Sequence, residues 1–353
     1  MGTDFRPRAT VLVAVLALFL GGAAHAADHA ETHKVIFDTD FGICPQDDCY
    51  ALMLALQSPE LDILGITTVA GNWSLEQGTA DVLRLLEIAG REKIPVYAGA
   101  DMPLMHEPSE YARTTYGSWW SDEAPTEPPG GFAEKQVEAA GAVEYIVDTL
   151  ESQPGEVTIL AIGPLTNVAI ALRHRPGLAA KVKQLVIMGG AVAVLPDGGG
   201  NMTPGAEFNF WVDPEAAKIV LRSGIPIQLS PLNVSRKSSF TQEWFQKLVA
   251  TETPFTQLIR ERGRVGWAED SPDIVIHMYD QIAVASLIDP TLVTTAELYV
   301  DVDANPGIGY GTSHGFSRIW PGSEGAQKMA VQHELDWERF IEMFIERVGG
   351  PLR

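Results

Sequence analysis

Four aspartates lie close together in the segment VIFDTDFGICPQDDCYALMLAL, residues 35–56: Asp38, Asp40, Asp47 and Asp48. An apolar run precedes them, an apolar helical pattern follows, and the segment contains no lysine or arginine. Buried carboxylates without a cationic partner are very costly, so a cation has to neutralise them. Oxygen ligands favour Ca²⁺ or Mg²⁺ over zinc. The alternative is that these aspartates cap a helix and lie at the surface.

The elements that would position the aspartates are predicted from apolar runs that alternate with helical patterns. Six short runs are rich in β-branched residues: KVIFD, DILGITTVAG, IPVYAG, VTILAIG, QLVIMGG and IPIQLS. Strand, turn and helix in alternation indicate βαβ units. The runs are apolar throughout, which is typical of parallel strands covered on both faces. The predicted fold is therefore α/β, a mostly parallel, Rossmann-like central sheet flanked by helices, in one domain over residues 30–353.

The ends of other predicted strands supply further polar groups. In open α/β sheets, ligands bind outside the carboxyl ends of the strands. Asn72 follows the second run, and the Gly-Pro turn of AIGPLTN could aim a backbone carbonyl at a metal ion. Asp280 begins a helical pattern in HMYDQIAVASL and is a candidate metal ligand. The segment NMTPGAEFNF contains groups suited to a hydroxyl-rich ligand such as a sugar: Asn201, Glu207 and Asn209. Each lone asparagine could instead be a turn residue.

The first 26 residues are predicted to be a signal peptide. Arg6 and Arg8 precede the apolar run TVLVAVLALFLGGAA, and AHA at residues 24–26 is a typical cleavage site. The run is shorter than the ~20 residues that a membrane span needs, which favours cleavage over anchoring. The mature protein is expected to be periplasmic or secreted. A formal net charge of -21 disfavours nucleic acid and anionic membranes as partners.

The chain has two cysteines, Cys44 and Cys49. Two are too few for a disulfide framework. An oxidising compartment permits a bridge between them, but one is predicted to lie in a loop and the other at the start of a helix. The distance and direction limits on a disulfide therefore favour two free thiols.

Taken in order, the motifs resemble those of the inosine–uridine preferring nucleoside hydrolases. They run from about residue 34 to 290: DTD…DD…ALMLAL, GITTVAGN, GPLTN, MGG, AEFNFWVDPEAA and YDQIAVA. The resemblance implies the nucleoside hydrolase fold and hydrolysis of a ribonucleoside to ribose and free base. It also implies one Ca²⁺ ion at the carboxyl edge of the sheet and a homodimer or homotetramer.

The resemblance further implies roles for individual residues. Asp40 would take the proton of the attacking water, and Asp38 would lie outside the ligand shell. The Ca²⁺ ligands would be Asp40, Asp48, Asp280 and the backbone carbonyl of Ile162. The ribose contacts would be Asp47 and Asn209 at the 2′- and 3′-hydroxyls, Asn201 and Glu207 at the 5′-hydroxyl, Asn72 near ribose and metal, and Met188 along the sugar pocket.

The sequence departs from the family pattern at two places. Six residues, FGICPQ, separate Asp40 from Asp47 where many members have three, so the roles of Asp47 and Asp48 are uncertain by one place. Tyr279 stands where a histidine protonates the leaving base in one branch, and it shares a face with His277 only on a strand-like approach. Aromatic stacking could activate the base instead, and loop packing is an equal interpretation of the aromatic candidates: Tyr116, Trp119, Trp120 and Trp267.

Two other classes of function remain open at this stage. A riboside-binding protein with weak or lost catalysis would explain the tyrosine at the acid position. An Mg²⁺-dependent phosphatase of the haloacid dehalogenase type would explain VIFDTD as an Asp-x-Asp motif after a strand. The phosphatase ranks last, because it leaves the Asp47–Asp48 pair and GPLTN unexplained.

Overall fold

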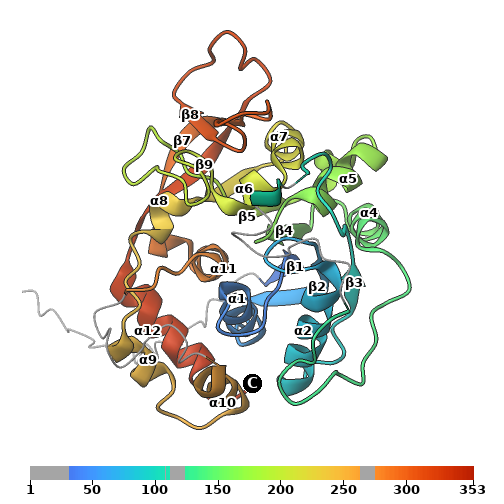
Figure 1. Cartoon of the computed structure of the whole chain (residues 1–353), viewed down its shortest axis with the longest axis vertical. Helices are drawn as coiled ribbons and strands as arrows, with labels where there is room; N and C mark the ends of the chain where they lie inside the picture. The colour runs from blue at the N-terminus through green and yellow to red at the C-terminus, as the bar shows by residue number, and fades with distance from the viewer. Residues whose placement is uncertain (1–31, 108, 112–123, 263–274) are drawn as a thin grey trace, which may run out of the picture. The chain divides into compact units, whose positions relative to one another are not determined.

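A computed structural model describes residues 32–107, 109–111, 124–262 and 275–353 (Figure 1). These residues belong to one compact unit, Thr32–Arg353. The predicted signal peptide lies outside the described residues. Within the described residues, no helix is both long enough and apolar enough to span a membrane.

A nine-stranded sheet in the order β3-β2-β1-β4-β5-β6-β9-β7-β8 forms the centre of the described unit. Neighbouring strands from β3 to β9 are parallel, while β7 is antiparallel to both β9 and β8. The predicted fold class, a mostly parallel central sheet, is therefore confirmed. The bounds are His33–Thr39 (β1), Leu61–Thr68 (β2), Val96–Ala98 (β3), Val157–Ala161 (β4), Gln184–Met188 (β5), Ile227–Ser230 (β6), Val293–Val302 (β7), Ser313–Phe316 (β8) and Gln327–Leu335 (β9).

Helices cover both faces of the sheet, as the apolar strand runs require (Figure 1). In β1, Val35 and Phe37 pack into a core shared with α1, α2, α11 and α12, and Ile36 packs into a second core with α4, α5 and α7. The α-helices are Asp47–Leu56 (α1), Leu75–Ile88 (α2), Ala142–Ser152 (α4), Thr166–His174 (α5), Phe208–Val212 (α6), Pro214–Leu221 (α7), Leu232–Ser235 (α8), Gln242–Leu248 (α9), Pro254–Arg262 (α10), Asp280–Ile288 (α11) and Trp337–Val348 (α12). Two short 3₁₀ helices are Leu178–Lys181 (η1) and Pro290–Leu292 (η3).

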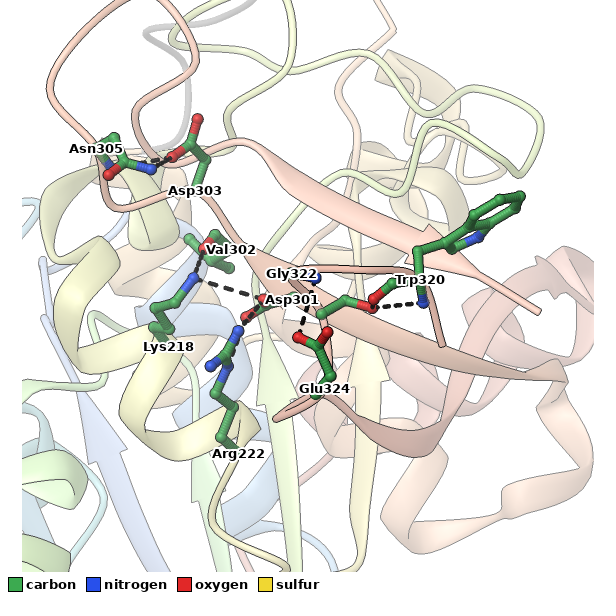
Figure 2. Close-up of polar contacts among 10 residues, drawn as sticks. Lys218, Arg222, Asp301, Val302, Asp303, Asn305, Trp320, Gly322 and Glu324 are labelled. Atoms are coloured by element: carbon green, nitrogen blue, oxygen red, sulfur yellow. Dashed lines mark hydrogen bonds and ion pairs between the residues drawn. The ribbon is translucent and has the colours of Figure 1, made fainter. Parts of the chain in front are cut away.

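A buried aspartate attaches the antiparallel extension of the sheet to α7. Asp301 in β7 accepts hydrogen bonds from Arg222 Nε at 3.0 Å and from Lys218 Nζ at 3.5 Å. Lys218 Nζ also donates to the carbonyl of Val302 at 2.7 Å. Figure 2 shows both cationic side chains reaching the same carboxylate. These contacts hold β7 against the parallel part of the sheet.

The strand order reverses at β1, which pairs with β2 on one side and with β4 on the other. Ligands bind in the crevice outside the carboxyl ends of the strands at such a switch point. Asp40 immediately follows β1 at this point. The fold thus places the aspartate-rich segment where an α/β sheet forms its binding site.

The expectation of two free thiols is wrong, because Cys44 and Cys49 form a disulfide. Residues 44–46 turn back toward α1, and the Gln46 N–H lies 3.4 Å from the Ile43 carbonyl oxygen. The turn brings the two Cα atoms to 5.3 Å, within the range that a disulfide spans. The peptide bond between Cys44 and Pro45 is cis.

Candidate active site

Three carboxylates from two helices converge beside the end of β1. Asp47 and Asp48 form the first turn of α1, and Asp280 is the first residue of α11. The two helices pack against each other, as Figure 1 shows. One oxygen atom from each carboxylate lies within 4.8 Å of the others, a grouping that could hold a metal ion. The structure therefore brings together three of the acidic residues predicted from the sequence.

Asp40 lies next to this cluster with one oxygen atom unused. Its side chain is 1% exposed, and Oδ2 accepts the backbone N–H of Asn72 at 2.6 Å. Oδ1 is buried and has no hydrogen-bond partner among the described residues. A Cβ atom on Gly71 or Gly163 would lie 2.2 or 2.7 Å from this carboxylate. The motifs VAGNW and AIGPLTN therefore supply glycines that let two loops approach Asp40 closely.

Asp48 is held by two polar side chains. Asn72 Nδ2 donates to Asp48 Oδ2 at 3.0 Å, and Thr39 Oγ1 donates to Asp48 Oδ1 at 2.5 Å. Because its backbone binds Asp40, Asn72 joins the two carboxylates. Thr39 is a site residue that the sequence interpretation missed, although it lies within the DTD motif.

Asp38 contacts different residues from those of the cluster. Its Oδ1 atom accepts hydrogen bonds from Thr67 Oγ1 at 2.5 Å and from Asn167 Nδ2 at 2.8 Å. Burial raises the pKa of Asp38 to about 6. The carboxylate is tied to β2 and to α5, and it is not one of the three grouped carboxylates.

Burial and mutual repulsion raise the pKa values of the clustered carboxyls. Burial, followed by the charge of Asp48, raises the pKa of Asp40 well above its ordinary value. Burial and then the charge of Asp47 do the same to the pKa of Asp280 and raise that of Asp48 to about 7. The described residues that line the adjoining cavity include no lysine or arginine. A hard divalent cation fits this set of oxygen atoms and would keep it ionised.

The opposite wall carries the residues predicted to bind the sugar. Glu207, which caps α6, is 2% exposed and accepts the backbone N–H groups of Gly190, Asn209 and Phe210 at 2.8, 2.8 and 3.1 Å. Burial raises the pKa of Glu207 to about 7. Asn209 Nδ2 donates to the carbonyls of Ile162 at 2.9 Å and Met188 at 3.2 Å.

A cavity of about 530 Å³ joins the two walls. It has room for a nucleoside-sized ligand and combines polar groups with an aromatic region. Asp40 and Asp48 lie behind its surface, while the other predicted residues line it directly: Asp47, Asn72, Ile162, Met188, Asn201, Glu207, Asn209, Tyr279 and Asp280. The aromatic lining includes residues that the sequence interpretation did not name: Tyr50, Phe208, Phe240 and Phe344.

Tyr279 and His277 both line the cavity, with ring centroids 6.5 Å apart. Ile276 pairs with Phe240 as an isolated β-bridge, so the approach to α11 is strand-like and alternate residues share a face. His277 Nδ1 lies 3.0 Å from the Ser238 carbonyl oxygen. Because a carbonyl can only accept, Nδ1 carries the proton and Nε2 remains available to a ligand. Burial, and then the charge of Asp47, raises the pKa of Tyr279.

The other aromatic candidates lie outside the described residues: Tyr116, Trp119, Trp120 and Trp267. The two-residue spacing of His277 and Tyr279 in HMYD was the sequence signal for their position side by side.

The stabilisation that a divalent ion gives to the fold is expected to grow as the pH rises. A carboxyl with a raised pKa in the folded protein contributes stability below its unfolded pKa and loses it as the pH rises through the folded pKa. For Asp48 this window runs from 3.8 to about 7. Bound cations favour the ionised carboxylates and oppose that loss. The increase in urea midpoint on adding Ca²⁺ should therefore be larger at pH 8 than at pH 5. An equal increase at both pH values would contradict the electrostatics of the site.

The chain matches one protein family over most of its length. Residues 35–342 match the profile of the family described as inosine-uridine preferring nucleoside hydrolase. The pyrimidine-specific ribonucleoside hydrolase RihB of Escherichia coli is 33% identical over 92% of this chain and 99% of its own length. The Schizosaccharomyces pombe protein C1683.06c is 34% identical over 90% of this chain and 99% of its own length.

Solved structures of nucleoside hydrolases superpose on the described fold. The plant nucleoside hydrolase PpNRh1 is 33% identical with a TM-score of 0.77, covering 90% of this chain and 99% of that one. The purine-preferring ribonucleoside hydrolase of Gardnerella vaginalis is 27% identical with a TM-score of 0.73, covering 90% and 98%. The predicted enzyme class, a hydrolase acting on N-glycosyl compounds, is the class of these named hydrolases.

Proposed function

Because the chain belongs to the inosine–uridine preferring nucleoside hydrolase family, we propose that it cleaves the N-glycosidic bond of ribonucleosides in a Ca²⁺-dependent reaction that releases ribose and free base. The observation that carries the proposal is the buried Oδ1 of Asp40, which has no hydrogen-bond partner among the described residues and lies beside three convergent carboxylates. Release of free ribose from nucleosides, with and without Ca²⁺, tests it. Normal binding of a ribose analogue without turnover of any nucleoside would instead favour a riboside-binding protein.

We expect Ca²⁺ rather than the smaller Mg²⁺ at this site. Asp40, Asp48, Asp280 and the Ile162 carbonyl would hold the ion, and sugar hydroxyls bound by Asp47 and Asn209 would complete the shell. Ca²⁺ accepts six to eight oxygen ligands in a flexible arrangement, whereas Mg²⁺ demands a near-ideal octahedron (about six ligands) and usually retains several waters. When bound, the ion lowers the pKa of an adjacent water molecule.

The side chains supply the remaining chemistry. Asp40 Oδ1 is free to take the proton of the attacking water, because its other oxygen is engaged by Asn72. Cleavage of the C–N bond builds positive charge on the ribose, as in glycoside hydrolysis. The surrounding carboxylates stabilise that charge. Asn201 and Glu207 would hold the 5′-hydroxyl and fix the sugar relative to Asp40.

The Tyr279→Phe variant is expected to keep kcat within about tenfold of the wild type, because loss of a general acid typically costs 10²- to 10⁴-fold. The raised pKa of Tyr279 makes its hydroxyl a poor proton donor at neutral pH. Its ring would remain to pack against the base. Rates of ribose release by Tyr279→Phe and His277→Ala, measured side by side, check whether the Tyr279 hydroxyl protonates the leaving base. A hundredfold or greater loss confined to Tyr279→Phe would restore the tyrosine as the acid.

We also propose that residues 1–26 are a cleaved signal peptide and that the mature enzyme acts in the periplasm or outside the cell. Support comes from the basic and apolar pattern of that segment and from the Cys44–Cys49 bridge, since disulfides persist in oxidising compartments. The mass of the protein recovered from fractionated cells would show whether the segment is removed and where the protein resides.

A further inference from the structure

The Cys44–Cys49 disulfide closes a short ring of residues 44–49, and this ring contains Asp47 and Asp48. We propose that the bridge positions these two carboxylates for the divalent ion and so sets the affinity of the site. The inference rests on the proposed Ca²⁺ dependence of the enzyme. Neither cysteine would touch the ion or the substrate, so the bridge acts through the aspartates that it encloses.

Both ends of the bridge lie in well-packed positions. Cys49 directly follows Asp48 in the first turn of α1, and Cys44 begins the turn that leads into that helix. Both cysteines are 0% exposed. Because Cys49 is anchored in α1, a covalent link from it to Cys44 fixes the path of the turn. Asp47 and Asp48, in the first turn of α1, lie between the two linked residues.

Thr39 and Asn72 hold the Asp48 carboxylate, whereas the other polar contacts of this loop with the described residues are long. The Ile43 N–H lies 3.3 Å from Asp81 Oδ2, and Arg262 Nε lies 3.4 Å from the Cys44 carbonyl oxygen. Gln281 Nε2 lies 3.2 Å from the Asp47 carbonyl oxygen. Protein N–H···O hydrogen bonds typically measure about 2.7–3.2 Å. These contacts are at or beyond the end of that range, and the disulfide is a covalent restraint on the turn that leads into α1.

The loop needs such a restraint because its charges repel each other. One oxygen atom from each of Asp47, Asp48 and Asp280 lies within 4.8 Å of the others, so these carboxylates, when ionised, repel each other and push the ring away from α11 if no cation is present. Six residues between Asp40 and Asp47 also give an unbridged segment more freedom to move outward. A bridged ring loses less conformational entropy when ion binding orders it.

The same arrangement links ion binding to the redox state. Dithiothreitol would give two electrons and two protons to the bridge, become a cyclic disulfide itself, and leave Cys44 and Cys49 as thiols. The loop would then be free to respond to the repulsion among the aspartates. Affinity for Ca²⁺ is therefore expected to be highest in an oxidising compartment.

The test is calorimetric titration of Ca²⁺ into the chelator-treated wild type and into a Cys44→Ala/Cys49→Ala double variant. The double variant should bind Ca²⁺ about 10- to 100-fold more weakly, the loss typical when groups that support metal ligands are removed. Its kcat should return toward the wild-type value at saturating Ca²⁺. Val300→Ala is the matched control, because Val300 is buried in β7 outside the cavity lining. It should lower the melting temperature without changing the affinity for Ca²⁺.

Equal Ca²⁺ affinity in the double variant and the wild type, with only a lower melting temperature, would overturn the inference. If the double variant does not fold, Ca²⁺ is titrated instead into wild type reduced with dithiothreitol. A count of two free thiols shows that the bridge is open, and an unchanged circular dichroism spectrum shows that the protein is still folded. Unaltered affinity after reduction also overturns it. Absence of Ca²⁺ binding by the oxidised wild type would instead overturn the proposed Ca²⁺ dependence on which the inference rests.

Discussion

The Asp40→Asn variant should release ribose about 10²- to 10⁴-fold more slowly than the wild type and remain folded, since this is the usual contribution of a general base. An asparagine preserves the shape of the side chain and can still accept the Asn72 N–H through its oxygen. It cannot take a proton from water, and it removes one negative charge from the proposed ion site. Initial rates of ribose release at saturating Ca²⁺, together with circular dichroism spectra, measure both parts of the expectation.

Asp301→Asn is the control for this variant. Asp301 is also a buried aspartate, but it binds Lys218 and Arg222 (Figure 2). It does not line the cavity. The Asp301→Asn variant should be less stable than the wild type and should keep the wild-type activity. If Asp40→Asn retained more than about a tenth of the wild-type rate, the loss would fall below the range of a general base. The assigned role of Asp40 would then be wrong.

Removal of divalent ions should abolish hydrolysis and lower the melting temperature. The described residues that line the cavity offer no lysine or arginine to neutralise its carboxylates. An ion that binds only the folded protein stabilises it, by about 2.7 kcal/mol at a concentration one hundred times its Kd. The melting temperature and the rate of ribose release should both fall after chelation, and both should recover when Ca²⁺ is added back.

Mg²⁺ is the control for the choice of ion. Adding Mg²⁺ to the chelated enzyme should restore less activity than adding Ca²⁺, because Mg²⁺ demands stricter geometry and releases its waters reluctantly. Equal recovery with the two ions would leave a divalent site without preference for Ca²⁺. Full activity in the chelated enzyme would contradict metal dependence altogether.

The parallel part of the fold could be predicted because its signals are local. Each buried strand carries its own apolar run, and the carboxyl ends of parallel strands meet at one edge. The position of Asp40 at that edge followed from this rule, whereas Asp280 was proposed as a ligand from the helix that it begins and from the family resemblance. The extension formed by β7, β8 and β9 was not predicted, because many side chains of β7 are partly or fully exposed and it pairs with β9 some thirty residues away in the sequence.

Other features of the site depend on distances that no short motif records. The bridge between Cys44 and Cys49 depends on how residues 44–46 turn, and the sequence pattern assigned them only to a loop. Phe344 reaches the cavity from α12, near the end of the chain. His277 gains its place from the bridge between Ile276 and Phe240, which lie far apart in sequence. In each case tertiary packing decides the position.

The most direct test of the proposed activity is release of free ribose from inosine, adenosine, guanosine, uridine and cytidine, measured with Ca²⁺ and after chelation. We expect ribose from at least one nucleoside with Ca²⁺ and none after chelation, and the nucleosides cleaved would identify the preferred base. No release from any nucleoside by folded, Ca²⁺-loaded enzyme, or release that persists after chelation, would contradict a Ca²⁺-dependent nucleoside hydrolase.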